Sequence, residues 1–142
     1  ELAKEIYDKG MLLPEFLAIW SWSSIFIEKY CGNEHILIDG TPRKFMEISI
    51  LDSAIKFFGI KNPNVIFLNV GEQWSIARLT GRKRFDDNPD EIKKRLDWYN
   101  SDVAPVIDYY KNNSDYRFIE INGEQIPDEV HRDIVKSLAL EM

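Results

Sequence analysis

The segment that most constrains the fold of this chain is residues 65–68, an uninterrupted apolar run inside the sequence NVIFLNVG. A strand with one face in solvent alternates apolar and polar residues, whereas a strand covered by helices on both faces is apolar throughout. Two other short segments have strand character, HILIDG at 35–40 and YRFIEI at 116–121. Helical patterns separate the three segments, and this alternation predicts a parallel α/β sheet with right-handed crossovers.

Helical patterns fill most of the remaining chain. They cover residues 2–9, 14–30, 73–80 and 89–110, a stretch that begins soon after Pro42 and stops at Gly59, and the stretch from Pro127 onward. The best-marked start has Asn88 as N-cap, Pro89 in the first turn and Glu91 three residues after the cap. Pro105 predicts a kink in the long helix.

We therefore expect one domain over residues 1–142, with about three parallel strands and flanking helices in a three-layer α/β arrangement. Three strands form a thin sheet for segments this apolar, because a central strand needs partners at both edges. The pattern predicts that part of the sheet is missing from this chain.

Charge and composition exclude several classes of protein. The formal net charge of −6 and the pI near 5.0 argue against a general nucleic-acid-binding protein. The single cysteine, Cys31, cannot form an internal disulfide, so a reducing cytoplasm is the expected compartment. No apolar run approaches the ~20 residues of a membrane span, and the charged N-terminal stretch does not fit a secretory signal. We expect neither a nucleic acid nor a membrane as a partner.

Asp39 follows the predicted strand ILIDG. In an open parallel sheet, ligands bind beyond the carboxyl ends of the strands. A carboxylate there can hold Mg²⁺ directly or through water. Asp followed by Gly is also common in turns, so a simple turn residue is the alternative interpretation.

The sequence RLTGRKRFDD, residues 78–87, contains four cationic residues followed by two adjacent aspartates. Arg78 and Arg82 are four residues apart, so on a continuous helix they share a face. Like charges this close repel each other. One interpretation is therefore an arginine clamp for an anionic ligand. The other is a surface loop in which Asp86 and Asp87 neutralise the arginines.

Two further arginines favour the clamp. Arg95 follows Ile92 by three residues and precedes Tyr99 by four, so it flanks the apolar stripe, where an unpaired charge is costly. Arg43 can bind a phosphate in a bidentate manner, although a lone arginine near a helix start is often a solvated charge. Guanidinium groups from separate segments form a suitable site for transferring phosphoryl charge.

Five segments resemble, in the correct order, motifs from the C-terminal two-thirds of the adenylate kinase family, which moves a phosphoryl group between ATP and a nucleoside monophosphate. They are KGMLLP, ILIDGTPR, RLTGRKRFDD, EIKKRLDWYNSDVAPVIDYY and INGEQIPDEV. The resemblance implies an incomplete P-loop kinase fold, ATP as co-substrate and Mg²⁺ as cofactor. It also implies that residues 1–33 end the monophosphate-binding helices and that residues 78–88 form a minimal lid.

The resemblance implies a role for each matching residue. The residues that would stabilise the transferred group are Arg43, Arg84 and Arg95. Those that would line the monophosphate are Met11, Leu12, Leu13, Gly40, Arg43, Glu47, Arg84 and Arg95. Those that would contact ATP are Arg78, Arg82, Gly123 and Gln125. Asp39 would hold Mg²⁺ through water, and Asp86 and Asp87 would orient the lid arginines.

The chain also departs from the family pattern. No G-x-x-x-x-G-K-[ST] phosphate loop occurs in it. We therefore expect a fragment or split protein that is poorly active or inactive alone, and that aggregates or pairs with a second chain, whereas the full enzyme is expected to be a monomer. A single residue separates Arg82 from Arg84, so the lid is minimal.

Glu47 stands where the family usually has a glutamine that reads adenine, and Thr41 replaces the usual aromatic residue. A carboxylate only accepts hydrogen bonds, so it suits a base edge with two donors, as in guanine. Three functions therefore stay open: an adenylate kinase, a kinase for another monophosphate such as GMP, and a non-catalytic nucleotide-binding or interaction module that uses the aromatic helix at 14–30.

Overall fold

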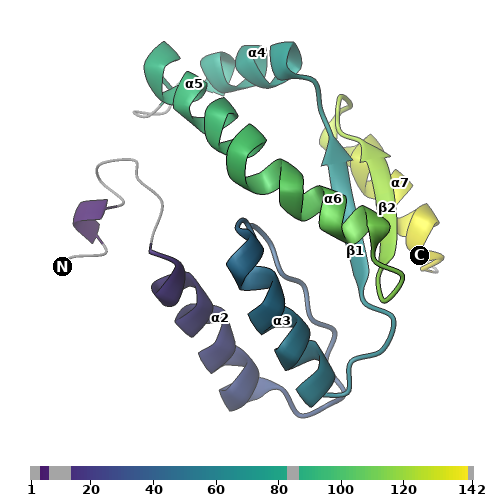
Figure 1. Cartoon of the computed structure of the whole chain (residues 1–142). Coiled ribbons are helices and arrows are strands. Elements are labelled where there is room, and N and C mark those ends of the chain that lie inside the picture. The colour runs from purple at the N-terminus through teal and green to yellow at the C-terminus, as the bar shows by residue number, and fades with distance from the viewer. Residues whose placement is uncertain (1–3, 7–13, 83–86, 141–142) are drawn as a thin grey trace. The chain divides into compact units, whose positions relative to one another are not determined.

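The computed structural model describes residues 4–6, 14–82 and 87–140, with the helices and strands shown in Figure 1. The chain divides into two compact units, residues 1–61 and 62–142, which are described here one after the other. Residues 4–6 are helical, within the helix expected at 2–9. Among the described residues, no helix has both the length and the apolar character needed to cross a membrane.

The first unit is a pair of contacting helices, α2 (Glu15–Lys29) and α3 (Phe45–Phe57), which lie side by side in Figure 1. Phe26 is the buried residue of α2. The centroid of its ring lies 5.8 Å from that of Trp22 and 5.6 Å from that of Phe58. Such ring pairs stabilise a core by about 0.5–1.5 kcal/mol each beyond the burial of area. Trp20, six residues before Phe26 on the same helix, is 67% exposed and does not join this core.

Helix α3 ends as the sequence predicts, at Gly59. This glycine has φ +67°, a left-handed conformation that glycine adopts without a steric penalty. Its N–H donates to the carbonyl of Lys56 at 3.2 Å, and the N–H of Ile60 donates to the carbonyl of Ile55 at 3.0 Å. These two bonds form a Schellman motif, which satisfies carbonyls that the helix end would leave unpaired.

The prediction of a strand at residues 35–40 is wrong. Residues 35–39 have no strand conformation, and Leu37 is 90% exposed. A strand exists only through a hydrogen-bonded neighbour, and the described residues supply none to this segment. The segment leads instead into Gly40, at φ +74°, and a cis Thr41-Pro42 peptide bond.

The second unit contains the sheet. Strands β1 (Asn64–Asn69) and β2 (Arg117–Asn122) pair in parallel, with Val65 opposite Phe118 and Asn69 opposite Asn122. The α/β class with a parallel sheet is confirmed, although the described residues form two strands rather than about three. Because the register aligns both carboxyl ends, the loops after β1 and β2 meet at one edge.

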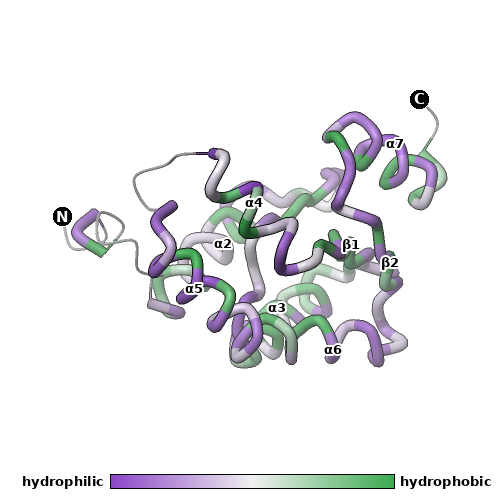
Figure 2. Tube along the Cα trace, turned by 90° about the horizontal axis from the view of Figure 1, so that it is seen from above, coloured by the Kyte–Doolittle hydropathy of each residue, from purple (hydrophilic) through white to green (hydrophobic). Residues whose placement is uncertain are grey.

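Helix α7 (Pro127–Leu138) contacts β2, whose Ile119 and Ile121 are buried. Figure 2 shows apolar residues along the two strands, and it shows hydrophilic and hydrophobic residues alternating along α7. That alternation is typical of a surface helix with one apolar face.

The expected long helix has three parts, α5 (Pro89–Trp98), the π-helical turn η1 (Tyr99–Val103) and α6 (Ala104–Asn112). The Asn88 side chain accepts a hydrogen bond from the Glu91 N–H at 3.0 Å, so the predicted N-cap is confirmed. The π-helical turn ends two residues before Pro105, which has no N–H and whose ring crowds the carbonyl four residues earlier, inside this turn. The kink predicted at Pro105 is therefore a widened turn.

Candidate functional site

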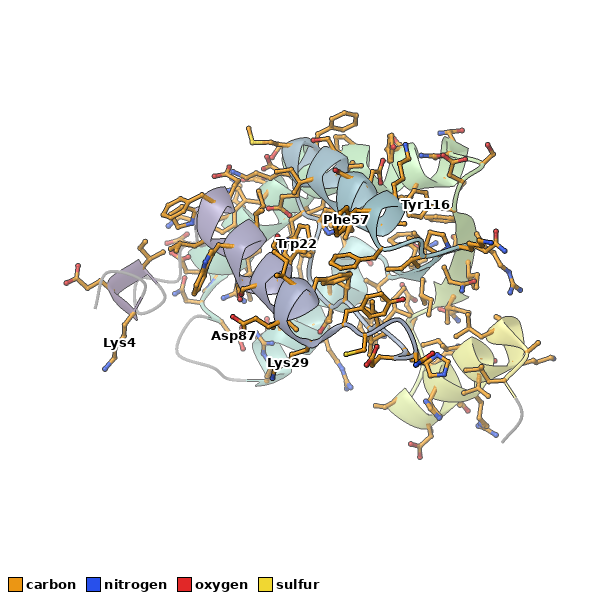
Figure 3. The ribbon with its side chains drawn as sticks, turned by 90° about the horizontal axis from the view of Figure 1, so that it is seen from below. Lys4, Trp22, Lys29, Phe57, Asp87 and Tyr116 are labelled. Carbon is orange, nitrogen blue, oxygen red and sulfur yellow. The ribbon has the colours of Figure 1, made fainter. Side chains whose placement is uncertain are left out.

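Asp87, in the second unit, accepts hydrogen bonds from two arginines. Its side chain is 1% exposed, and it stands between α4 (Glu72–Arg82) and α5. Arg82 donates to it from Nε at 3.0 Å and from Nη2 at 2.7 Å, and Arg95 donates from Nη1 at 3.2 Å. The structure thus brings together Arg82, from the last turn of α4, and Arg95, from the last turn of α5. Asp87 is among the labelled side chains of Figure 3.

The charges of this group favour an anionic ligand. Two guanidinium groups and one carboxylate carry one net positive charge between them. The Arg82 contact is bidentate, a geometry that fixes the guanidinium plane as well as its position. The side chains of Arg82 and Arg95 are 37% and 26% exposed, so water reaches both. Arg84 and Asp86, the other predicted members of the group, lie outside the described residues.

Arg78 lies on α4 and is exposed. Its guanidinium carbon is 5.5 Å from the ring centroid of Trp74, one turn earlier, which is a cation–π contact. The predicted contact of Arg78 with the ATP adenine stays a prediction.

Gly123 lies at the shared carboxyl edge of the strands. Its N–H donates to the carbonyl of Asn69 at 2.8 Å, which extends the strand pairing by one residue. A Cβ at this position would lie 2.6 Å from Val70 Cγ1, so only glycine allows this close approach.

Gln125 is the second predicted ATP-contacting residue at this edge, and its side chain is hydrogen-bonded within the chain. Its Nε2 donates to the carbonyl of Asn122 and to Asp133 Oδ2 on α7, each at 2.9 Å. The side-chain amide is therefore bound within the chain. The predicted lining of the adenine by this segment stays a prediction.

Glu124 at the same edge was missed by the sequence reasoning. Its Oε1 accepts a hydrogen bond from the Gly71 N–H at 2.7 Å and so connects the loop after β2 to the start of α4. The only sequence signal is indirect: both residues follow segments with parallel-strand character, and loops after such strands meet at one edge.

Asp39, Gly40 and Arg43 belong to the first unit. A Cβ built on Gly40 would lie 2.8 Å from Arg43 Nη2, so the guanidinium of Arg43 lies over the glycine backbone. Asp39 is exposed. Among the described residues, no group of three His, Cys, Asp or Glu side chains could hold a metal ion. A lone accessible carboxylate fits the predicted contact with Mg²⁺ through water, because Mg²⁺ keeps several waters and binds substrate phosphates.

Glu47 is buried, with 5% of the residue exposed. Its Oε2 accepts hydrogen bonds from the Arg43 N–H at 2.8 Å and from Thr41 Oγ1 at 3.1 Å. Met11, Leu12 and Leu13, the other predicted contacts of the base, lie outside the described residues. Arg43 belongs to one unit and Arg82 with Arg95 to the other, so their meeting on one ligand stays a prediction.

Shifted pKa values occur at Glu15, Lys94 and Tyr99. A hydrogen bond from Lys44 lowers the pKa of Glu15, and a hydrogen bond to Glu91 raises the pKa of Lys94. Burial raises the pKa of Tyr99, and the charge of Asp108 adds to this shift.

The parallel α/β architecture is that of an incomplete P-loop kinase fold. A family model described as adenylate kinase matches residues 1–115. Adenylate kinase 1 of Nostoc sp. is 31% identical over 136 residues, and the adenylate kinase of Leptospira biflexa is 34% identical over 140 residues. The adenylate kinase of Bacteroides thetaiotaomicron is 33% identical over 140 residues. Each match covers 96% of this chain and 72–74% of the relative. The chain belongs to the adenylate kinase family.

Proposed function

We propose that this chain takes part in the transfer of the γ-phosphoryl group of ATP to a nucleoside monophosphate, giving two diphosphates. The observation that carries the proposal is the Asp87 group, in which one buried carboxylate orients Arg82 and Arg95. Phosphoryl transfer requires mainly positioning and neutralisation of charge, and oriented guanidinium groups provide both.

Each arginine has a separate part in this proposal. Arg82, together with Arg84, binds the ATP phosphates, and Arg95 lies between the two nucleotides and stabilises the transferred group. Arg43 holds the phosphate of the monophosphate. Asp39 would hold Mg²⁺ through its water shell, and the ion would neutralise phosphate charge when bound. A guanidinium has five N–H donors, and the bonds to Asp87 take two of those of Arg82 and one of those of Arg95.

AMP is the monophosphate we propose, because the relatives are named adenylate kinases. A kinase for GMP is the second candidate, and the carboxylate of Glu47 is the feature that favours it. The hydrogen bonds that Glu47 Oε2 already accepts from Arg43 and Thr41 weigh against that candidate.

A non-catalytic interaction module is the third candidate. It is favoured by the exposed aromatic residues of α2, where Phe16 is 68% and Trp20 is 67% exposed. A module of this kind would bind ATP or a protein partner without turnover.

The experiment is a turnover assay with MgATP and each of AMP, GMP, CMP and UMP. It uses this chain and a form extended by any coding sequence upstream of Glu1. We expect turnover with AMP when a phosphate loop is present, and little or none with this chain alone. Indifference to all four monophosphates in the extended form would contradict both kinase candidates, and nucleotide binding without turnover would support the module.

A further inference from the structure

Glu47 is a buried carboxylate whose hydrogen bonds go to its own chain. It lies in the first turn of α3, and its Oε2 accepts from the backbone N–H of Arg43 at 2.8 Å and from the hydroxyl of Thr41 at 3.1 Å. The two donors lie on either side of Pro42. The carboxylate therefore holds the turn that carries Arg43 against the start of the helix.

The same contacts make base recognition through Oε2 of Glu47 costly. If Oε2 turned toward a base edge, the Arg43 N–H and the Thr41 hydroxyl would lose this acceptor, and a buried polar group without a partner is destabilising. Thr41 and Glu47 are also two positions at which the sequence departs from the motif that it resembles. In the structure these two departures are bonded to each other.

The position of the Arg43 backbone determines where its guanidinium group lies. Its guanidinium lies over Gly40, so the side chain runs back along the turn that Glu47 fixes. A shift of the backbone N–H would move the whole side chain, and displacement of a phosphate-binding group by about 1 Å can reduce turnover by about a hundredfold.

We infer that Glu47 is a positioning residue: with Thr41, it fixes the backbone of Arg43, and it does not select the base of the monophosphate. The inference rests on the proposed function, because it takes Arg43 to be a phosphate ligand. Other residues then select the base, and the KM values for AMP and GMP should depend on Glu47 to the same degree.

The test compares Glu47→Ala, Glu47→Gln, Thr41→Val and the matched control Thr41→Ser in the catalytically competent extended form. Glu47→Ala removes the acceptor, so we expect the KM values for AMP and GMP to rise by the same factor, about tenfold or more, with the KM for ATP unchanged. Glu47→Gln keeps a carbonyl oxygen with two lone pairs, so it should stay within about threefold of the parent for both monophosphates. Thr41→Val should show a smaller effect in the direction of Glu47→Ala, and Thr41→Ser none.

A second measurement does not depend on catalysis. Amide hydrogen exchange at Arg43 should become about tenfold faster or more in Glu47→Ala, while exchange at Leu51, in the middle of α3, stays the same. Unchanged exchange at Arg43 would overturn the inference, as would a Glu47→Gln protein whose preference between AMP and GMP changes by about tenfold or more. A parent protein without turnover would refute the proposed function, and the exchange rates would still decide whether Glu47 fixes Arg43. If Glu47→Ala does not fold, Thr41→Val supplies the same comparison.

Discussion

Arg82 donates two hydrogen bonds to the carboxylate of Asp87, from Nε at 3.0 Å and from Nη2 at 2.7 Å. The Asp87 side chain is 1% exposed and that of Arg82 is 37% exposed. The carboxylate is thus the enclosed partner and the guanidinium is the partner that solvent reaches. Asp87 also accepts from Arg95, so one carboxylate bonds both arginines.

Asp87→Asn should reduce turnover of the extended form by about a hundredfold, because the amide lacks the charge that holds both guanidinium groups. The free energy of unfolding should fall by only about 1–3 kcal/mol, since the arginines remain partly solvated. Steady-state kinetics and urea unfolding measure the two effects. Asp97→Asn, which changes an exposed carboxylate on α5, is the control and should change neither quantity. Equal turnover in both variants would show that Asp87 has no part in catalysis.

Arg95→Ala should cut turnover more than it lowers stability. We expect a loss of about a hundredfold to a thousandfold in kcat and about 1 kcal/mol or less in unfolding free energy, because the proposed function assigns Arg95 to binding phosphoryl charge. The neighbouring Lys94→Ala, which removes an exposed cation paired with Glu91, should leave kcat within about twofold. If Arg95→Ala instead lowered stability strongly with little effect on kcat, Arg95 would have a structural role.

Gly123→Ala and Gly81→Ala should have opposite effects on stability. The added Cβ at 123 would lie 2.6 Å from Val70 Cγ1 and 3.2 Å from the Asn69 carbonyl, so we expect a loss of about 1–3 kcal/mol. At Gly81, in the last turn of α4, nothing among the described residues lies within 4 Å of the added Cβ, and alanine should stabilise the helix by about 0.5–1 kcal/mol. Thermal or urea unfolding measures both. A Gly123→Ala protein as stable as the parent would show that the strand ends are looser than described.

The Glu15 and Lys44 pair should make stability depend on pH in the acidic range. The hydrogen bond from Lys44 lowers the pKa of Glu15 below its ordinary value of 4.5. The stabilisation is therefore present above that ordinary value and is lost as the pH falls through the lower value of the folded state. Glu15→Gln should remove this part of the pH dependence in urea unfolding. Glu28→Gln, at an exposed position near the end of the same helix, is the control and should retain the pH dependence. If the unfolding free energies of Glu15→Gln and the parent depended on pH in the same way, the effect would be refuted.

Signals carried by neighbouring residues predicted the fold well. The apolar run at 65–68 became β1, although its residues are half-buried or exposed rather than buried. Asn88 became an N-cap and Gly59 ended α3, because a cap depends on residues adjacent in the sequence. The segment at 35–40 has the same apolar character and is not a strand, because strand formation requires a partner that local sequence does not specify.

By itself, the sequence determined the family, through motifs in a fixed order, and it determined most helix and strand positions, through capping residues and apolar periodicity. Only the tertiary structure decided which groups meet. It placed Arg82 and Arg95 on one carboxylate, Glu124 on the N–H of Gly71 and Glu47 on the turn before its helix. Charged and polar side chains bind whichever partner the packed backbone brings within about 3 Å, and chain folding, not residue type, sets that distance.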